Sequence, residues 1–510
     1  MGVKLGLVVV LTATAIVLGP AWAKLPSDTS TSATAGVEEV KSRLAKAFDL
    51  ARDHNEKAAL PLFQSAIAEP AFSQLDAELR HITLYLTGAL ELERGPRDDA
   101  LRLAKIATAM DEADGDDWHL LLDAADDADD MDDTVRALAT IAQKWPATLS
   151  DVSDDAIFRI ARDAATLPAG EARQLDLIAS LKEAHWTPND PFSDPSNLWR
   201  DLARDFLDRG QVPQAREALA LVTDPHIMVS VRIDKTFDPV TRENPGRFDS
   251  ATVMAAHIDA LRNLRSKHPD SLAGVNELAR ELMSAGRDEE ALKILDEAIA
   301  HASPADGLRS AYSDVETQLI WTFDARSDAL VHLGRFDDAI AEMAKGAKRP
   351  ERGGLNISQV VNLAGLQSRL GRPKEALAEI ADVGPGSAYG KLAIAETKLS
   401  AYVQLGEKDK VAQILADART HVKDAPGLVE NMLVEAGDLD GAAALYVQRL
   451  NDPTMRDEAL LAVQQWLDKG AKMPVADELD RRDTQVQARP DVQAAIKAVG
   501  RVETIPFRNR

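Results

Sequence analysis

Three features of this sequence have residue types that could do chemistry: an acidic run, a glycine-rich loop and ten histidines. The acidic run, residues 111–133 (DEADGDDWHLLLDAADDADDMDD), would supply oxygen ligands for calcium. A calcium loop needs such ligands at alternating positions, with a glycine sixth and a glutamate twelfth. Asp111, Gly115 and Asp116 do not keep that register, and residues 118–122 have the apolar character of a buried helix face. The run therefore predicts a charged turn between helices, and we expect no metal site.

The glycine-rich loop, residues 384–391 (GPGSAYGK), is superficially similar to a phosphate-binding loop. That motif has four residues between its glycines and a Ser or Thr after the lysine. Here five residues separate Gly384 from Gly390, and Leu392 follows the lysine. The segment predicts a connection between helices and no nucleotide cofactor.

The histidines, which include His54, His119 and His226, are scattered and form no H-E-x-x-H pair on one helix face. No G-x-S-x-G motif of a serine hydrolase is present. The chain has no cysteine, which excludes disulfides, thiol catalysis and thiolate metal sites. We therefore predict that the protein is not an enzyme and has no catalytic residues, metal or cofactor.

A recurring spacing indicates which elements build the fold. Six glycines are each followed five residues later by an alanine: Gly95/Ala100, Gly210/Ala215, Gly286/Ala291, Gly334/Ala339, Gly371/Ala376 and Gly437/Ala442. In most of these units a large apolar residue stands nine positions after the glycine and a small residue seven before it. The pattern predicts a helix that ends at a left-handed glycine, then a second helix packed closely against the first. Such a hairpin can bury its apolar face only against the next hairpin.

These hairpins resemble tetratricopeptide repeats (TPRs). The best match is 320–350, and Gly334, Gly371, Gly406 and Gly437 are 37, 35 and 31 residues apart, near the 34-residue period of that family. The match is good over 275–453 and degenerate elsewhere, as in 120–146, where Asp130 replaces the glycine. The resemblance implies an all-α protein, an α-solenoid of antiparallel helix hairpins. Helical periodicity dominates the sequence, and the longest strand-like alternation is at 227–233.

The resemblance also implies where a ligand would bind. In TPR arrays the first helix of each pair lines a concave face. By their offset from the capping glycine, five cationic or amide residues should face solvent there: Arg204, Asn276, Arg280, Asn362 and Arg369. Such side chains could hold the carboxylates or the backbone of a bound peptide.

Breaks in the helical pattern suggest the domain boundaries. Residues 187–197 contain three prolines and predict a loop, and 225–249 predict an irregular insertion in which Phe237 and Phe248 pack onto neighbouring helices. We expect degenerate helical repeats in 37–186, then a loop, one helix pair and the insertion in 187–249, the TPR-like array in 250–453, and capping helices with a tail in 454–510. The number of repeats and the role of the insertion stay open.

The N-terminus predicts export. Lys4, an apolar run of about 15 residues and the sequence Ala21-Trp22-Ala23 are typical of a signal peptide, residues 1–23, with cleavage before Lys24. The run is shorter than the roughly 20 residues that span a bilayer. Residues 24–36 are small and polar and predict a flexible linker. We expect a periplasmic mature chain with no integral membrane segment.

The formal net charge of −24 argues against nucleic acid as a partner, because phosphates would be repelled over most of the surface. The leading hypothesis is a periplasmic TPR-like scaffold that binds a peptide segment or a protein of the cell envelope through its concave face. The alternative is a structural or assembly factor that acts by self-association or by tethering to the envelope, without a ligand in the groove. The sequence leaves the partner, the pathway and the oligomeric state open.

Overall fold

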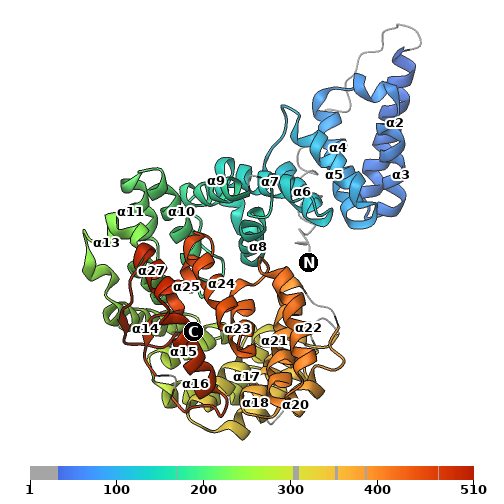
Figure 1. Cartoon of the computed structure of the whole chain (residues 1–510). Coiled ribbons are helices and arrows are strands. Elements are labelled where there is room, and N and C mark those ends of the chain that lie inside the picture. The colour runs from blue at the N-terminus through green and yellow to red at the C-terminus, as the bar shows by residue number, and fades with distance from the viewer. Residues whose placement is uncertain are drawn as a thin grey trace. The chain divides into compact units, whose positions relative to one another are not determined.

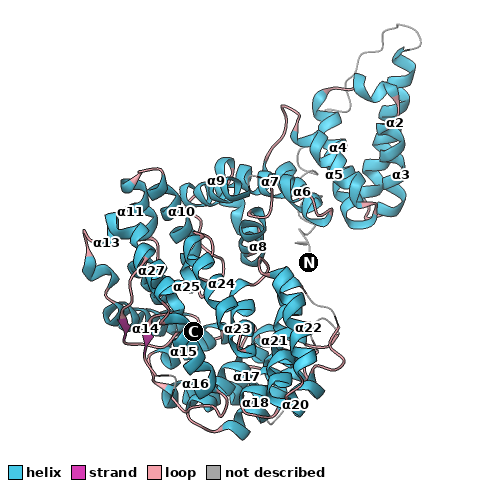
Figure 2. Cartoon of the chain, viewed as in Figure 1, coloured by secondary structure: helices cyan, strands magenta, loops and turns pink. Residues whose placement is uncertain are grey.

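The computed structural model describes residues 33–168, 170–302, 309–350, 354–384, 387–468 and 470–509. The predicted signal peptide and most of the predicted linker lie outside these ranges. By its internal contacts the chain divides into two compact units, Met1–Leu202 and Ala203–Arg510. The described residues are helical almost throughout, as Figure 2 shows, and the predicted all-α class is confirmed.

The first unit is a series of helices connected by short turns. Its elements are α2 (Ala33–Arg52), α3 (Glu56–Ile67), η2 (Pro70–Gln74), α4 (Ala77–Arg94), α5 (Arg97–Thr108), α6 (Gly115–Asp127), α7 (Met131–Lys144), η3 (Pro146–Asp151), α8 (Asp154–Ala164) and α9 (Gly170–Glu183). Helix α2 begins within the predicted linker, four residues before the expected start at Val37. The pairs α2–α3, α4–α5 and α6–α7 pack as hairpins. Phe48 and Phe63 meet edge to face in the core, with ring centroids 5.0 Å apart.

The turns of the first unit use residues that the glycine pattern does not find. His54, Asp129 and His185 have φ angles of 57°, 58° and 52°, so three residues other than glycine are left-handed in these turns. Before α7 the left-handed residue is Asp129 and not Asp130, which was expected to replace the glycine. Gly95, in contrast, has φ −107° and ψ −171°, and the prediction that it caps α4 in the left-handed conformation is wrong. The reason is Pro96, since a proline restricts the residue before it to extended backbone. Beside Asp129, Asp130 accepts a hydrogen bond from the Asp133 N–H and begins α7.

The second unit contains the array. Its elements are the end of α10 (Ser196–Asp208), α11 (Val212–Ala220), α12 (Pro225–Ile233), η4 (Lys235–Phe237), α13 (Asp238–Thr241), η5 (Pro245–Phe248), α14 (Ser250–Lys267), α15 (Leu272–Ser284), α16 (Asp288–Ala302), α17 (Val315–His332), α18 (Phe336–Ala347), α19 (Ile357–Arg369), α20 (Pro373–Glu379), α21 (Ala388–Leu405), α22 (Lys408–Ala418), η6 (Arg419–His421), α23 (Pro426–Ala436), α24 (Leu439–Asn451), α25 (Arg456–Ala462), β1 (Gln465–Trp466), α26 (Ala476–Gln487), α27 (Pro490–Val499) and β2 (Thr504–Ile505).

The hairpins of this unit form as the glycine spacing predicts. Gly210, Gly286, Gly334, Gly371, Gly406 and Gly437 all have φ between +73° and +81°. The small residues let paired helices approach: Ser327 and Ala339 are fully buried, and the Ser327 hydroxyl donates to the Ala339 carbonyl across 2.9 Å. Met343 fills the space behind them at 3% exposure. The first helices also pack on one another, α15 on α17, α19 on α21 and α21 on α23, which gives the predicted solenoid of antiparallel hairpins.

The segment 225–249 is helical and not strand-like. Pro225 occupies the first turn of α12, and the Asp224 carboxylate caps it by accepting from the His226 and Ile227 N–H groups. Phe237 and Phe248 are buried, at 0% and 2% exposure. The proline and the capping carboxylate therefore favour a helix here, although residues 227–233 alternate as a strand would.

The C-terminal segment returns to the beginning of the second unit. Strands β1 and β2 pair in parallel, and Gly500 forms a bridge with Asp234. Arg508 is almost buried and donates to Asp288 at the start of α16 across 2.6 Å. Figure 1 shows the red C-terminal helices beside the green helices that begin this unit. These residues therefore also contact the start of the array, in addition to the end that they were expected to cap.

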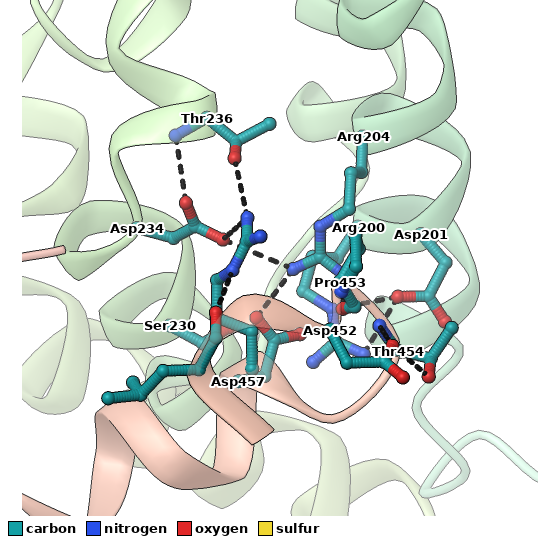
Figure 3. Close-up of polar contacts among 12 residues, drawn as sticks. Arg200, Asp201, Arg204, Ser230, Asp234, Thr236, Asp452, Pro453, Thr454 and Asp457 are labelled. Carbon is teal, nitrogen blue, oxygen red and sulfur yellow. Dashed lines mark hydrogen bonds and ion pairs between the residues drawn. The ribbon is translucent and has the colours of Figure 1, made fainter. Parts of the chain in front are cut away.

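A buried cluster of charges, the closure cluster, joins the beginning and the end of the second unit (Figure 3). Arg204 on α10 pairs with Asp457 on α25 at 2.5 Å and with Asp234 after α12 at 3.5 Å. Arg456 pairs with Asp234 at 3.8 Å and donates to the Thr236 hydroxyl across 3.3 Å. Asp234 is fully buried, so its carboxylate depends on these two arginines for its counter-charge.

Candidate functional site

A cavity of about 660 Å³ lies within the second unit, on the inner side of the array. The first helices of four successive hairpins, α17, α19, α21 and α23, form most of its wall. Helix α26 with the residues before it, and Met343 of α18, form the rest. Pockets of roughly 300–1,000 Å³ are typical of sites for compact ligands. The cavity is therefore large enough for a small molecule or a few residues of a peptide.

The repeat itself determines which positions face this cavity. Asp328, Gly365, Ser400 and Asn431 all line it, and each stands six residues before the capping glycine of its hairpin. The positions nine or ten residues before that glycine line it as well, because they lie one helical turn away on the same face. A single repeat position therefore supplies one lining residue from each of the four helices, and at Gly365 that residue is backbone alone.

Amide side chains of one hairpin hold carboxylates of the hairpin before it. Asn362 on α19 donates from Nδ2 to Oδ1 of Asp324 on α17 across 3.1 Å. In the same way Asn431 on α23 donates to Oε1 of Glu396 on α21 across 3.3 Å. These bonds join the inner helices and orient the carboxylates.

Helix α26 closes one side of the cavity. Arg482 donates from Nη1 to the Glu435 carbonyl at 2.6 Å and to the Val434 carbonyl at 3.3 Å, two carbonyls in the last turn of α23. Before α26 the Ala471 N–H donates to the His332 carbonyl across 3.0 Å. Gly470 makes this approach possible, because its φ is +88° and a Cβ there would lie 2.5 Å from the same carbonyl oxygen. The C-terminal segment thus runs from the end of α17 to the end of α23.

Burial raises the pKa values of four carboxyl groups of the cavity, Asp324, Asp328, Glu396 and Glu435. Burial raises the pKa of Asp328 to about 6, and the neighbouring Asp324 adds to this, against the opposing charge of Arg369. Burial raises the pKa of Glu396 to about 7, where the hydrogen bond from Asn431 opposes it and the charge of Glu435 adds to it. Glu396 therefore keeps its proton to a higher pH than an ordinary glutamate.

The five residues predicted to bind a peptide fall in different places. Asn362 and Arg369 line the cavity. Arg280 is outside the lining and pairs with Glu277 at 3.3 Å, although its charge lowers the pKa values of two cavity carboxyls. Arg204 belongs to the closure cluster of Figure 3, and Asn276 is 1% exposed and donates to the Gln318 carbonyl. These last two side chains are thus occupied by the chain itself, because the ends of the array meet at Arg204 and α17 covers Asn276.

The sequence prediction missed the acidic residues of the cavity. Asp324 and Asp328, Glu396 and Glu435 all line it, although only cations and amides had been selected from the inner helices. The same offset from the capping glycine would have found Asp328, since it is equivalent to Arg204 and Arg280. The offset from the glycine therefore indicates the position that faces the cavity, whatever the charge of the side chain there.

The acidic run and the glycine-rich loop lie elsewhere. Asp114 and Asp117 form a capping box at the start of α6, and Asp117 Oδ2 is 2.7 Å from Nε2 of His81. Within the described ranges no three His, Asp or Glu side chains are grouped so that they could hold a metal ion. Ser387 caps α21 by accepting from the Gly390 N–H, so this part of the loop serves a helix terminus. Among the helices that the structure describes, none has the length and apolar character needed to cross a bilayer.

Comparison with known proteins adds structural matches only. No protein-family profile matches the chain, and no curated protein has a significant sequence match. The crystal structure of yeast Tom70 is 9% identical with a TM-score of 0.32, and covers 90% of this chain and 99% of its own. The structure of the APC/C hetero-tetramer Cut9-Hcn1 is 10% identical with a TM-score of 0.27, and covers 91% and 92%. The TPR-like fold is therefore assigned from the hairpins of this chain, not from these superpositions.

Proposed function

We propose that this protein is a periplasmic scaffold that binds a peptide segment of an envelope protein in the cavity between α26 and the inner helices α17, α19, α21 and α23. The cavity carries this proposal, since it is a concave space in a fold of stacked hairpins and is lined by polar side chains that a partner can reach. The protein acts by binding, without a chemical step. The N-terminal run ending at Ala23 supports export.

Obstruction of the cavity tests this function. Ala393 lines it on α21, whereas Ala416 on α22 is exposed and outside the lining. Ala393→Trp would fill part of the space, and Ala416→Trp adds the same side chain elsewhere. Ser400→Leu provides a second, smaller obstruction on the same helix, for use if the larger one disturbs folding.

The measurement is affinity capture from an envelope extract with the full-length chain as bait, followed by mass spectrometry. We expect a partner that the unaltered chain and Ala416→Trp recover and that the cavity variants lose. No partner above background, or equal recovery by all variants, would contradict the proposal. Circular dichroism of each variant establishes that its helices are intact.

A further inference from the structure

The cavity wall has a strong excess of negative charge. Its carboxylates come from α17, α21, α23 and α26: Asp324, Asp328, Glu396, Glu435, Asp480 and Asp483. Among the described lining residues Arg369 is the one guanidinium, and no lysine is present. A ligand that carries carboxylates would meet repulsion over most of this surface. This composition reverses the expectation of a site for acidic peptides.

Four of these carboxyl groups have no cation of the described part of the chain in direct contact with them. Asp324, Asp328, Glu396 and Glu435 form no ion pair within 4.0 Å among the described residues. Amide side chains donate directly to two of them, Asn362 to Asp324 and Asn431 to Glu396. The positive charge of Arg369 acts on Asp324, Asp328 and Glu396 without a direct ion pair. Amide donors orient a carboxylate without cancelling its charge. The surrounding protein therefore leaves a field that attracts a cation.

The cavity also offers surfaces for the rest of a cationic side chain. Tyr389 lies at its edge with 60% of its surface exposed, and an exposed aromatic ring can bind an ammonium or guanidinium group on its face. Met343, Leu428 and Leu479 add apolar lining. Methylene groups of a lysine or arginine can pack on such residues while the charged end reaches the carboxylates.

We infer that the ligand is a basic peptide segment, whose lysine or arginine side chains enter the cavity and meet the carboxylates of α17, α21 and α23. The inference rests on the proposed function and specifies its partner. The size of the cavity suits a few residues and not a folded domain. Free oligoamines share the same cationic chemistry, so the experiment must separate a peptide from a small amine.

Isothermal titration calorimetry of the full-length chain tests the inference with three probes. They are a capped Lys-Ala-Lys tripeptide, the matching capped Gln-Ala-Gln tripeptide, and spermidine. We expect saturable binding of the lysine peptide and none of the glutamine peptide at pH 8. Glu396→Gln should weaken binding about tenfold, and Asp328→Asn should have a similar effect. Glu379→Gln removes an exposed carboxylate on α20 outside the cavity and should leave the affinity unchanged.

The pH dependence of the binding affinity is an independent test of the inference. Glu396 faces Glu435 and Asn431 of α23 and Arg369 of α19, and Asp328 faces Asp324, Arg369, His332 and Arg280. At pH 5.5 Glu396 is mostly protonated and Asp328 is largely so, because burial raises both pKa values. The affinity for the lysine peptide should therefore fall at least tenfold from pH 8 to pH 5.5, and binding at pH 6.5 should release protons.

Three results would overturn the inference. They are no binding of the lysine peptide, binding of spermidine alone, and equal weakening by Glu379→Gln and Glu396→Gln. A partner captured by the unaltered chain but not by Ala393→Trp would still support the proposed function in that case. Failure of the basic-peptide inference is therefore distinguishable from failure of the proposed function.

Discussion

Asn431 on α23 donates a hydrogen bond to Glu396 on α21 across 3.3 Å, inside a cavity where neither side chain has a charged partner within 4.0 Å among the described residues. Asn362 and Asp324 repeat this relationship two inner helices earlier. An amide holds each carboxylate in place and leaves its charge to the cavity. The cavity of the array is thereby suited to attract a cation.

Glu396 should make the protein less stable as the pH rises. Burial raises its folded pKa to about 7, above the value of about 4.3 in an unfolded chain. The folded state therefore binds the proton more tightly, and this contribution is complete below pH 4 and lost as the pH rises through 7. Urea unfolding measures how much the free energy of unfolding falls from pH 5 to pH 8. This fall should be smaller for Glu396→Gln than for the unaltered chain, by on the order of 2 kcal/mol. Equal pH dependence of the two proteins would contradict this.

Arg204→Met should destabilise the second unit. The substitution leaves Asp234, which is fully buried, with a weaker counter-charge from Arg456 alone at 3.8 Å. Removal of one partner of a buried pair costs about 3 kcal/mol. Arg209, the residue after this helix, pairs with Asp205 and has 51% of its own side chain exposed, so Arg209→Met is the control, with little expected effect. Chemical unfolding measures the free energy of unfolding of both variants. Equal values for Arg204→Met and Arg209→Met would show that the closure cluster does not hold the two ends of the unit together.

Gly371→Ala should cost about 1 kcal/mol, because a side chain is strained in the left-handed conformation. Its φ is +74°, and a Cβ there would have nothing within 4 Å, so the cost is conformational and not steric. A Cβ at Gly384 would also meet open space, but the backbone there is not left-handed. Thermal unfolding should therefore show a lower midpoint for Gly371→Ala than for Gly384→Ala. The same midpoint for both would contradict the assignment of Gly371 as a helix cap.

Arg482→Met should loosen α26. This side chain donates to two carbonyls at the end of α23, and Val486 is the buried residue of α26. Hydrogen exchange over 476–487 should become faster, while the helices of the first unit keep their rates. Arg481→Met removes a neighbouring arginine whose ion pair among the described residues is with Glu478 of the same helix, and it should not change the exchange. Faster exchange in both variants would indicate that charge, and not the bonds to α23, holds the helix.

The sequence predicts the hairpins well because their signal is local. A glycine in the left-handed conformation and an alanine five residues later act within one turn and the start of the next helix, so Gly334 and Ala339 are informative without any distant contact. The first unit is harder, since Asp129 can adopt the left-handed conformation and Pro96 prevents Gly95 from doing so. A pattern built on glycine alone cannot detect either case.

The closure of the array and the charge of its cavity depend on contacts that are distant in sequence. Arg204 meets Asp457, and Arg508 meets Asp288, through pairings that have no periodic signature. The arginine at 204 therefore resembled a solvent-exposed ligand-binding residue, although it joins the two ends of the unit. The acids of the cavity had the right offset, but their common location became clear only when α17, α21 and α23 were placed side by side.

The most direct test of the cavity as the binding site is site-specific crosslinking in cells. The chain has no cysteine, so Ala393→Cys places a single thiol in the cavity and Ala416→Cys places one outside it. Each is labelled with a photoreactive group, illuminated, and analysed by mass spectrometry. The account predicts a defined crosslinked partner, joined through a lysine- or arginine-rich segment, from Ala393→Cys alone. The same products from both positions, or none from Ala393→Cys, would contradict it.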